Sequence, residues 1–463
     1  MPPALEPTMF REYDIRGRET ADELSANAVH AIGRAYGEFL RRRGIETLVV
    51  GRDSRATSEE LAHALIDGLI ETGRSVIDIG LSTTPMVYWA QYHFQAQGAA
   101  SVTASHNPPG WNGVKMAVGY SITTNRAEIE ELFDIVTHDR VEPSNGSLRH
   151  AEIADAYTAD LVQRVRVRSR PKVLVNTGNG TAGFIAPTIL REAGCEVAEL
   201  HTRMDSTFPH YPANPAIVEM MEDTGEHVRR ANAAIGVALD ADADRLGITD
   251  EQGCTIWPDI YMIPAVRDLL QRKPGSKVVF DVKCSQALVD VIRQHGGVPV
   301  MCKTGHSFVK ETLRAEHAEL GIEASGHIFI GDSYYGFDDA IFAALRLLDL
   351  LDKRGESVSQ ALADVPRYYS TPVYNAPCPD QVKYEITEQL VQRFKREGYR
   401  VIDISGARVE FEDGWGLVRA SSNLPQLVLR FEARTPERLR EIEAMFRGIL
   451  EDYEAVGREW ETG

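Results

Sequence analysis

The chain has 463 residues, of which 43% are hydrophobic and 25% are charged. This length exceeds what one ordinary hydrophobic core supports, so we expect roughly two to four domains. The apolar content excludes a disordered chain, and no stretch approaches the roughly 18 apolar residues of a membrane-spanning helix. The formal net charge of −18 disfavours nucleic acid and anionic lipid as partners.

The N-terminus has neither the basic start nor the apolar run of a targeting sequence, so we expect a cytoplasmic protein. The dense basic run Arg41-Arg42-Arg43 is interpreted as the end of a helix, whose dipole it complements. The cysteines are odd in number and lack C-x-x-C spacing, which predicts neither a disulfide framework nor a zinc knuckle. They are Cys195, Cys254, Cys284, Cys302 and Cys378.

Apolar β-branched runs alternate with amphipathic segments through about the first 365 residues, which predicts repeated βαβ units and largely parallel sheets. The pattern occurs in three copies. Each copy opens with a strand that closes in a polar turn, and a helix and a second strand follow. The opening strands are predicted at residues 48–53, 173–178 and 278–283, and the second strands at 76–80, 197–200 and 298–302.

From residue 368 the order changes to a strand-like start, a helix at 381–397, strands around 401–419 and 427–431, and a final helix. We therefore predict an α/β protein in which three similar α/β domains with mixed, largely parallel sheets surround a central active-site cleft and a C-terminal α+β domain follows them. The predicted domains are residues 1–153, 154–256, 257–366 and 367–463.

A later strand of each copy runs into a polar loop, at residues 105–107, 240–245 and 323–327. Ligands of open α/β sheets gather beyond the carboxyl ends of the strands. We therefore expect these three loops to line one binding site.

The second loop places Asp240, Asp242 and Asp244 within five residues, offset only by Arg245. Mutual repulsion disfavours three such carboxylates unless a cation binds, and oxygen ligands suit a hard ion, Mg²⁺ before Ca²⁺. An EF-hand is excluded although Glu251 falls at its twelfth position, because Arg245 occupies the sixth position, where that loop requires glycine. The segment is therefore predicted to bind Mg²⁺, and a solvated acidic turn is the alternative interpretation.

The segment Gly178-Asn179-Gly180-Thr181-Ala182-Gly183 matches the dinucleotide pattern G-x-G-x-x-G, and Glu199 lies where a ribose-binding acid would be. This leaves an NAD-dependent oxidoreductase as one alternative. A glycine-rich turn that serves only tight packing is the other interpretation of the segment.

Ser105 lies in a turn before Asn107-Pro108-Pro109-Gly110, and the chain has no G-x-S-x-G elbow that would indicate a hydrolase. Near the C-terminus, Arg419 precedes two hydroxyls and an amide, donors that suit a phosphate group. An ordinary strand-exit loop is the alternative there.

In this order, the motifs resemble the α-D-phosphohexomutase family, most closely its bacterial phosphomannomutase/phosphoglucomutase branch. The resemblance runs nearly from end to end. It is carried by Phe10-Arg11-Glu12-Tyr13-Asp14-Ile15-Arg16-Gly17, Thr103-Ala104-Ser105-His106-Asn107-Pro108, Asn112-Gly113-Val114-Lys115, the aspartate loop, Lys303-Thr304-Gly305-His306-Ser307, Glu323-Ala324-Ser325-Gly326-His327, Gly336-Phe337-Asp338-Asp339 and the Arg419 loop.

The resemblance implies a phosphorylated Ser105 as phosphoryl donor and Mg²⁺ held by the three aspartates and a phosphoserine oxygen. It implies that Glu323 and Ser325 bind sugar hydroxyls and that the Arg419 loop holds the phosphate that is not transferred. The general base is His306 or Lys115, between which the sequence does not choose. The implied catalytic residues are Ser105, His306, Lys115, Arg16 and Arg245, and the implied substrate-binding residues are Tyr13, Lys283, Glu323, Ser325, His327, Arg419, Ser421, Ser422 and Asn423.

The implied reaction interconverts hexose 1-phosphate and hexose 6-phosphate, of mannose, glucose or both, with hexose 1,6-bisphosphate as intermediate and activator. Small sugar phosphates are then the partners, with no nucleic acid, membrane or obligate protein partner expected. Two departures from the family pattern bear on substrate preference: Ile322 stands where glycine is common, and Ser422-Asn423 replaces S-N-T or S-G-T. A sugar-phosphate-binding protein without catalytic activity remains a further alternative.

Overall fold

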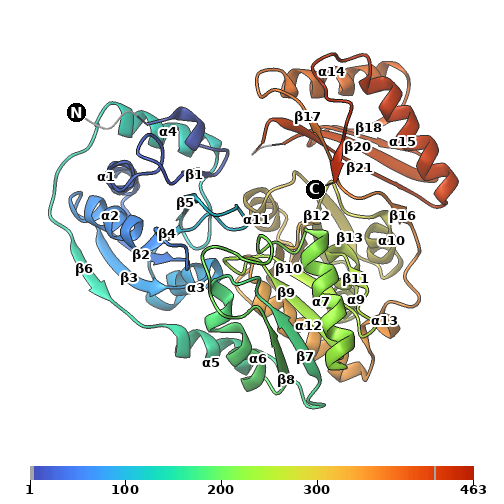
Figure 1. Ribbon diagram of the computed structural model, residues 1–463, viewed down its shortest axis with the longest axis horizontal. Coiled ribbons are helices and arrows are strands. Elements are labelled where there is room, and N and C mark those ends of the chain that lie inside the picture. The colour runs from blue at the N-terminus through green and yellow to red at the C-terminus, as the bar shows by residue number, and fades with distance from the viewer. Residues whose placement is uncertain (1–4, 422–423, 463) are drawn as a thin grey trace. The chain divides into compact units, whose positions relative to one another are not determined.

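The structure is a computed structural model that describes residues 5–421 and 424–462. The chain forms two compact units, whose helices and strands are labelled in Figure 1. The first contains the chain up to Trp257 together with Ser325–Ala361, and the second contains Pro258–Ala324 and the chain from Leu362 onward. Among the described residues, no helix is long and apolar enough to cross a membrane.

The first sheet of the first unit has the strand order β1-β5-β4-β2-β3-β6. Strand β2 is parallel to β3 and β4, β3 is parallel to β6, and β5 is antiparallel to both β4 and β1. The strands are β1 (Asp14–Arg18), β2 (Thr47–Arg52), β3 (Ser75–Leu81), β4 (Gly98–Val102), β5 (Trp111–Val118) and β6 (Ser147–His150). The antiparallel turn from β4 to β5 carries the predicted serine loop.

Helices α1, α2 and α4 contribute most of the core that lies against this sheet, and α3 packs on β2 and β4. The elements are η1 (Pro7–Met9), α1 (Ala26–Arg42), α2 (Ser58–Ile70), α3 (Thr84–Phe94) and α4 (Arg126–Thr137). Helix α1 begins at Ser25, whose side chain accepts the N–H of Ala28, and its last turn contains Arg41 and Arg42. The basic run therefore lies at a helix end, as the sequence predicts.

The second sheet has the order β11-β10-β9-β7-β8, with β7 parallel to β8 and β9. Strands β9 and β10 form an antiparallel pair, and the aspartate loop is the turn between them. The elements are α5 (Ala154–Arg164), β7 (Lys172–Asn176), η2 (Thr181–Phe184), α6 (Ala186–Glu192), β8 (Glu196–Leu200), α7 (Val218–Ala231), β9 (Ile235–Leu239), β10 (Leu246–Thr249) and β11 (Thr255–Ile256).

The later segment of the first unit supplies β15 (Ile328–Ile330), α12 (Ala340–Arg354) and α13 (Val358–Ala361). Helix α12 packs against β9 and β10, so it covers the strands that hold the aspartate loop. Residues far apart in the sequence therefore support one loop.

In the second unit, β12 is parallel to β13 and to β14. The elements are α8 (Pro258–Tyr261), α9 (Ile263–Arg272), β12 (Lys277–Asp281), α10 (Gln286–Gln294), β13 (Val298–Cys302), α11 (His306–Ala315) and β14 (Leu320–Ile322). All three predicted opening strands, and all three second strands, are present within one or two residues of their predicted positions.

The C-terminal part of the second unit is an antiparallel sheet in the order β18-β19-β20-β21-β17-β22, with β16 also paired to β21. Helices α14 and α15 pack on it around Phe394, Phe431 and Phe446. The elements are β16 (Tyr369–Ser370), β17 (Tyr374–Pro377), α14 (Lys383–Arg396), β18 (Arg400–Ile402), β19 (Ala407–Glu410), β20 (Gly414–Ala420), β21 (Gln426–Ala433), α15 (Pro436–Leu450) and β22 (Glu461–Thr462).

The strand predicted around residues 401–419 is wrong in extent, because three strands, β18, β19 and β20, occupy that stretch. Gly406 interrupts it with φ +89°, in the left-handed region that favours glycine, and an added Cβ would lie 2.4 Å from the carbonyl oxygen of Val418. A second turn follows, where the N–H of Phe411 donates to the carbonyl of Gly414. The mixed α/β domains and the α+β domain agree with the predicted fold class.

Asp339 caps the N-terminus of α12 and makes a pH-dependent contribution to stability. Its Oδ1 accepts the N–H of Phe342 at 2.9 Å, and its Oδ2 accepts the hydroxyls of Tyr157 and Tyr334 at 2.8 Å each. Burial, opposed by these hydrogen bonds, raises the pKa of Asp339 from 3.8 to about 6. The folded chain therefore holds this proton to higher pH than the unfolded chain.

Protonated Asp339 stabilises the fold fully below about pH 4, and this stabilisation is lost as the pH rises through about 6. The free energy of unfolding therefore falls by about 3 kcal/mol over this range. Asp339→Asn is expected to abolish this part of the pH dependence. Urea denaturation at a series of pH values from 4 to 7 measures it, with exposed Asp22→Asn as the control. An unchanged pH profile in Asp339→Asn would contradict the assignment.

Candidate active site

Ser105 lies at the start of the turn between β4 and β5, in the left-handed conformation with φ +50°. Its N–H donates to Thr103 Oγ1 at 2.9 Å, and its side chain is buried. The hydroxyl donates to Asp240 Oδ2 at 3.0 Å and lies 3.2 Å from His106 Nδ1. The serine loop of the first sheet therefore contacts the aspartate loop of the second sheet, as the strand-end argument predicts.

Asp240, Asp242 and Asp244 are all fully buried in the turn between β9 and β10. Asp240 Oδ1 accepts the N–H groups of Asp244 and Arg245 at 3.0 Å each, which fixes the turn. Burial, with the neighbouring Asp244 and Asp242 charges, raises the pKa of Asp240 well above its ordinary value. Three buried carboxylates therefore need positive charge nearby.

Lys115 on β5 provides one such charge. Its Nζ lies 2.7 Å from Asp242 Oδ2 and 2.5 Å from Asp244 Oδ2. Although burial opposes it, this pair of carboxylates raises the pKa of Lys115. Burial likewise opposes the ionisation of Asp244, yet Lys115 lowers the pKa of Asp244 to about 2. Lys115 is thus a protonated ammonium that leaves part of the carboxylate charge uncompensated.

The aspartate loop also meets the requirements of a metal site. Each of the three aspartates offers an oxygen, and these oxygens lie within 4.8 Å of one another. Oδ1 of Asp242 and Oδ1 of Asp244 are buried and have no hydrogen-bond partner among the described residues. Buried carboxylate oxygens that accept no hydrogen bond are suited to a hard divalent cation.

Two threonines orient the central aspartate. Asp242 Oδ2 accepts the hydroxyls of Thr84 at 2.6 Å and Thr103 at 3.3 Å, besides the Lys115 ammonium. The N–H of Thr84 also donates to the carbonyl of Asp242 at 3.0 Å. All donors therefore bind Oδ2, which leaves Oδ1 of Asp242 available for a cation.

Arg16 and Arg245 add two guanidinium groups beside these loops. Arg16 Nε donates to Asp14 at 2.8 Å, and its Nη1 donates to the carbonyl of Ala104 at 2.8 Å and to Asn107 Oδ1 at 3.0 Å. Arg16 therefore holds the serine loop directly from β1. Positive charge is concentrated here against the negative charge of the whole chain.

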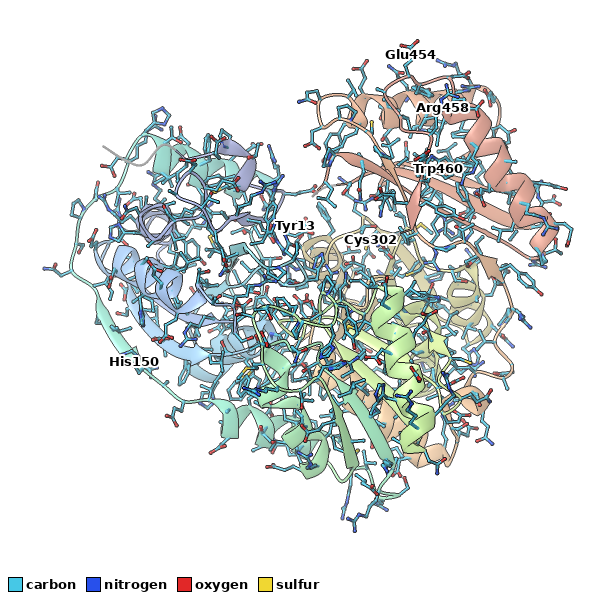
Figure 2. The ribbon with its side chains drawn as sticks, in the orientation of Figure 1. Tyr13, His150, Cys302, Glu454, Arg458 and Trp460 are labelled. Atoms are coloured by element: carbon cyan, nitrogen blue, oxygen red, sulfur yellow. The ribbon has the colours of Figure 1, made fainter. Side chains whose placement is uncertain are left out.

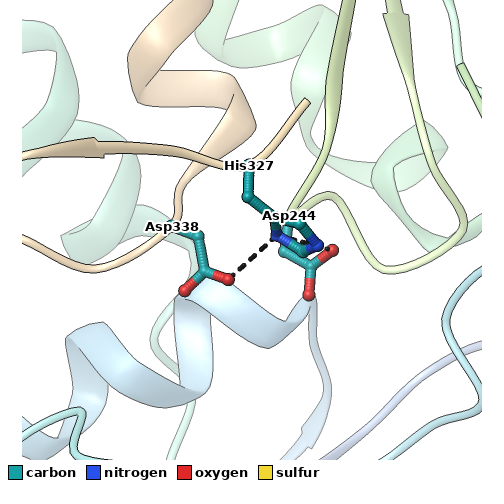
Figure 3. Close-up of side chains that lie close together, drawn as sticks. All are labelled: Asp244, His327 and Asp338. Atoms are coloured by element: carbon teal, nitrogen blue, oxygen red, sulfur yellow. Dashed lines mark ion pairs between the residues drawn. The ribbon is translucent and has the colours of Figure 1, made fainter. Parts of the chain in front are cut away.

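Arg245 contacts a buried histidine. Its Nε lies 3.0 Å from His327 Nε2, and His327 Nδ1 lies 3.0 Å from Asp338 Oδ2 and 3.7 Å from Asp244 Oδ1. Figure 3 shows His327 between the two carboxylates. The structure thus places His327, predicted as a substrate-binding residue, next to the aspartate loop. Tyr13, labelled in Figure 2, is half-buried immediately before β1 in the same unit, and Ser325 is also half-buried there.

The remaining predicted residues lie in the second unit, where Asp281 at the end of β12 joins three loops. Asp281 Oδ2 accepts the hydroxyl of Thr304 at 2.7 Å and lies 3.7 Å from Lys283 Nζ. Asp281 Oδ1 accepts the N–H of Ala324 at 3.1 Å. The loops that contain Lys283, His306 and Glu323 are therefore held together by one buried carboxylate. His306, the first residue of α11, and Glu323 are themselves buried.

Arg419, the residue before the last of β20, is buried, and its Nε has no hydrogen-bond partner among the described residues. Ser421 Oγ accepts the N–H of Leu424 at 3.2 Å. A buried guanidinium nitrogen without a protein partner suits an anion. Ser422 and Asn423, also predicted to bind phosphate, lie outside the described residues.

The glycine-rich segment at residues 178–183 supports the aspartate loop. The N–H of Thr181 donates to the carbonyl of Ala241 at 2.8 Å, and an added Cβ at Gly180 would lie 2.6 Å from Ala241 Cα. An added Cβ at Gly183 would overlap the carbonyl of Thr202. These contacts agree with the packing interpretation of the glycines, which need no nucleotide to explain them.

The comparison with known protein families shows which family the chain belongs to. Four models match along the chain in order: the phosphoglucomutase/phosphomannomutase alpha/beta/alpha domains I, II and III at residues 7–142, 155–253 and 257–369, and the C-terminal domain at 374–449. The chain belongs to the phosphoglucomutase/phosphomannomutase family.

Individual members of this family are similar to this chain over almost their whole length. The chain is 38% identical to the phosphomannomutase/phosphoglucomutase of Pseudomonas putida over 450 residues, 97% of each chain. It is 37% identical to the phosphoglucomutase of Neisseria gonorrhoeae, over 96% of each. A phosphoglucomutase/phosphomannomutase family protein of Burkholderia thailandensis superimposes with a TM-score of 0.90 at 35% identity, covering 97% of this chain and 99% of the other.

These matches confirm the resemblance, the fold class and the class of enzyme that the motifs imply. They give no support to the oxidoreductase or to the non-catalytic binding protein. The boundaries predicted for the four domains and the roles predicted for individual site residues stay predictions in this member of the phosphoglucomutase/phosphomannomutase family.

Sequence analysis missed several residues that shape the site. Thr84 and Thr103 orient Asp242, Asp281 joins three loops of the second unit, and Asp338 contacts His327. Thr103 and Asp338 lie in motifs that carry the family resemblance, whereas Thr84 and Asp281 are marked only by their place at the start of a helix and the end of a strand. Their partners are distant in the sequence, so spacing alone does not reveal them.

Proposed function

We propose that this chain interconverts the 1-phosphates and 6-phosphates of mannose, glucose or both, with a phosphorylated Ser105 as donor and hexose 1,6-bisphosphate as intermediate. One observation carries the proposal. The Ser105 hydroxyl lies 3.0 Å from Asp240, in a buried cluster that also contains two further aspartates and the Lys115 ammonium. A serine surrounded by metal ligands and cations suits phosphoryl transfer, which needs positioning and charge neutralisation.

Asp240, Asp242 and Asp244 would hold Mg²⁺ through oxygens that face one another, and a phosphoserine oxygen would complete its protein ligands. When bound, the ion neutralises charge on the phosphoryl oxygens. Oxygen-only ligands and a cluster of full negative charges favour Mg²⁺ over the softer transition metals.

The cationic side chains would position the phosphoryl group. Arg16 already holds the serine loop, Lys115 binds Asp242 and Asp244, and Arg245 is the last residue of the aspartate loop. In the transfer, the bond between Ser105 Oγ and phosphorus breaks and one forms to a sugar hydroxyl, whose proton passes to His306 or Lys115 as general base. Lys115 is protonated beside Asp242 and Asp244, so it would have to release that proton before acting as a base.

Further side chains would bind the rest of the substrate. Glu323 and Ser325 would bind sugar hydroxyls, and Arg419 with Ser421, Ser422 and Asn423 would bind the phosphate that is not transferred. Tyr13, Lys283 and His327 complete the proposed substrate-binding residues. The buried Arg419 nitrogen without a described partner supports the phosphate role. The bisphosphate intermediate must reverse its orientation so that its other phosphate returns to Ser105.

A coupled assay tests the proposed function. Mannose 1-phosphate and glucose 1-phosphate are supplied with Mg²⁺ and a catalytic amount of the corresponding 1,6-bisphosphate, and formation of the 6-phosphates is followed. We expect turnover that is lost with a chelator and stimulated by the bisphosphate. No turnover of any hexose phosphate would contradict the proposal, and binding without turnover would instead favour the non-catalytic alternative.

A further inference from the structure

Arg55 follows β2 in the turn that begins at Asp53, and it has no role in the site as described so far. Its side chain is only 3% exposed. A guanidinium group is charged at all physiological pH values, so burying it requires several partners. The contacts of Arg55 therefore indicate what the residue does.

Its guanidinium donates four hydrogen bonds, all to backbone carbonyls between Ser105 and Trp111, that is, to the serine loop and the first residue of β5. Arg55 Nη2 donates to the carbonyls of Ser105 at 2.7 Å and Asn107 at 2.5 Å. Arg55 Nη1 donates to the carbonyls of Pro108 and Trp111 at 3.1 Å each. One side chain thus binds four backbone carbonyls within seven consecutive residues.

The serine loop needs such donors because of its own backbone. Ser105 has a left-handed φ that residues with a Cβ rarely adopt, and Pro108 and Pro109 have no N–H to pair within the loop. The inward carbonyls must find donors elsewhere. The guanidinium has five N–H donors in a fixed plane, whereas a lysine ammonium has only three around one atom. Lysine therefore cannot bind all four carbonyls.

Arg55 is itself held in place. Its Nε lies 3.3 Å from Asp53 Oδ2, and Asp53 Oδ1 accepts both the N–H of Arg55 and the hydroxyl of Ser58. On another side, the guanidinium lies 5.1 Å from the ring centroid of Phe208. A carboxylate and an aromatic ring thus fix the orientation of the donors.

The same turn is also connected to the aspartate loop. The N–H of Ser54 donates to Thr181 Oγ1 at 2.9 Å, and the N–H of Thr181 donates to the carbonyl of Ala241. The turn that carries Arg55 is therefore linked to both loops whose contact brings Ser105 within 3.0 Å of Asp240.

We propose that Arg55 is a positioning residue for phosphoryl transfer: it fixes the backbone of the serine loop so that the phosphate on Ser105 faces the aspartate loop. This inference rests on the proposed phosphoserine function. Arg55 acts through backbone carbonyls and contacts no predicted substrate-binding side chain in the described part of the chain, so it affects the rate of transfer more than substrate binding.

Arg55→Lys keeps the charge and removes the planar set of donors. We expect kcat to fall by about 100-fold, the effect of a small misplacement of reacting groups, while KM stays within about twofold. Hydrogen exchange, read by mass spectrometry, should become faster in peptides covering residues 104–111 and stay unchanged in those covering the core of the first sheet. The control is Arg52→Lys, a neighbouring half-buried arginine paired with exposed Glu59, which should match the parent in both measurements.

Two outcomes would overturn the proposal: an unchanged kcat in folded Arg55→Lys, or a loss confined to KM. If Arg55→Lys does not fold, Asp53→Asn provides the same test, because it removes the carboxylate that orients Arg55. If neither variant folds, Arg55 is required for the fold and the positioning role is wrong. If the parent protein has no mutase activity, the proposed function is wrong. The hydrogen-exchange measurement does not require activity, so it still tests whether Arg55 fixes the serine loop.

Discussion

Ser105→Ala is expected to lower kcat by at least about 10³-fold, because it removes the atom that carries the phosphoryl group. It should also remove the covalent phosphate from the protein. Intact-mass spectrometry after incubation with hexose 1,6-bisphosphate measures that phosphate, which adds about 80 Da. The fold should persist, because the substitution removes just the hydroxyl contacts with Asp240 at 3.0 Å and His106 at 3.2 Å.

Ser121 provides a matched control for this substitution. Like Ser105, Ser121 is a buried serine in the left-handed region, with φ +53°, but it follows β5 instead of preceding it, and its hydroxyl lies 3.1 Å from that of Tyr92. Ser121→Ala should retain both the phosphate and the activity. Full activity of Ser105→Ala would exclude the phosphoserine mechanism, and phosphate retained on Ser105→Ala would assign the donor to another residue.

The parallel α/β parts of the fold could be predicted from the sequence because the pattern that indicates them is contained in short segments. An apolar strand such as β2, β7 or β12, closed by a polar turn and followed by a helix, shows its identity within about 20 residues. The C-terminal sheet was less accessible. Strands β18 to β20 follow one another through short turns, and the single glycine that breaks the run, Gly406, resembles any other glycine in the sequence.

The chemical groups of the site were likewise predictable, but their connections were not. Asp240, Asp242 and Asp244 are adjacent in the sequence, so their repulsion implies a cation. Thr84 and Asp242 are separated by 158 positions, and Lys115 and Asp242 by 127. Hydrogen bonds over such separations depend on how two sheets pack. The identity of a threonine or a lysine in the sequence does not indicate which distant residue it will contact.

The structure also explains how an acidic chain creates a site for anions. A site for a phosphorylated substrate needs cationic side chains that offset the total charge of −18. Lys115 on β5, Arg16 on β1 and Arg55 in the turn after β2 supply such side chains, each buried and each held by a carboxylate: Asp242 and Asp244, Asp14, and Asp53. Buried pairs of this kind keep their charge where surface pairs would be screened by salt.

Lys115→Met is expected to destabilise the metal-free protein by about 3 to 5 kcal/mol, because it leaves buried Asp242 and Asp244 without their counter-ion. The ammonium binds Oδ2 of both aspartates, whereas a cation would bind their Oδ1 atoms, so the two positive charges act on the same carboxylates from different sides. Mg²⁺ should therefore raise the melting temperature of Lys115→Met more than that of the parent, and thermal unfolding with and without Mg²⁺ measures the difference.

Lys383→Met is the control that distinguishes the larger Mg²⁺ response of Lys115→Met from the general effect of removing a buried lysine. Lys383 is also buried, but it pairs with exposed Asp380 and with the carbonyl of Leu424, in the C-terminal sheet domain. Its replacement should lower the melting temperature without increasing the response to Mg²⁺. An equal Mg²⁺ response in Lys115→Met and the parent would mean that ammonium and cation do not share the aspartates. A larger response only in Lys115→Met would show that the lysine keeps the carboxylates in place until the metal ion binds.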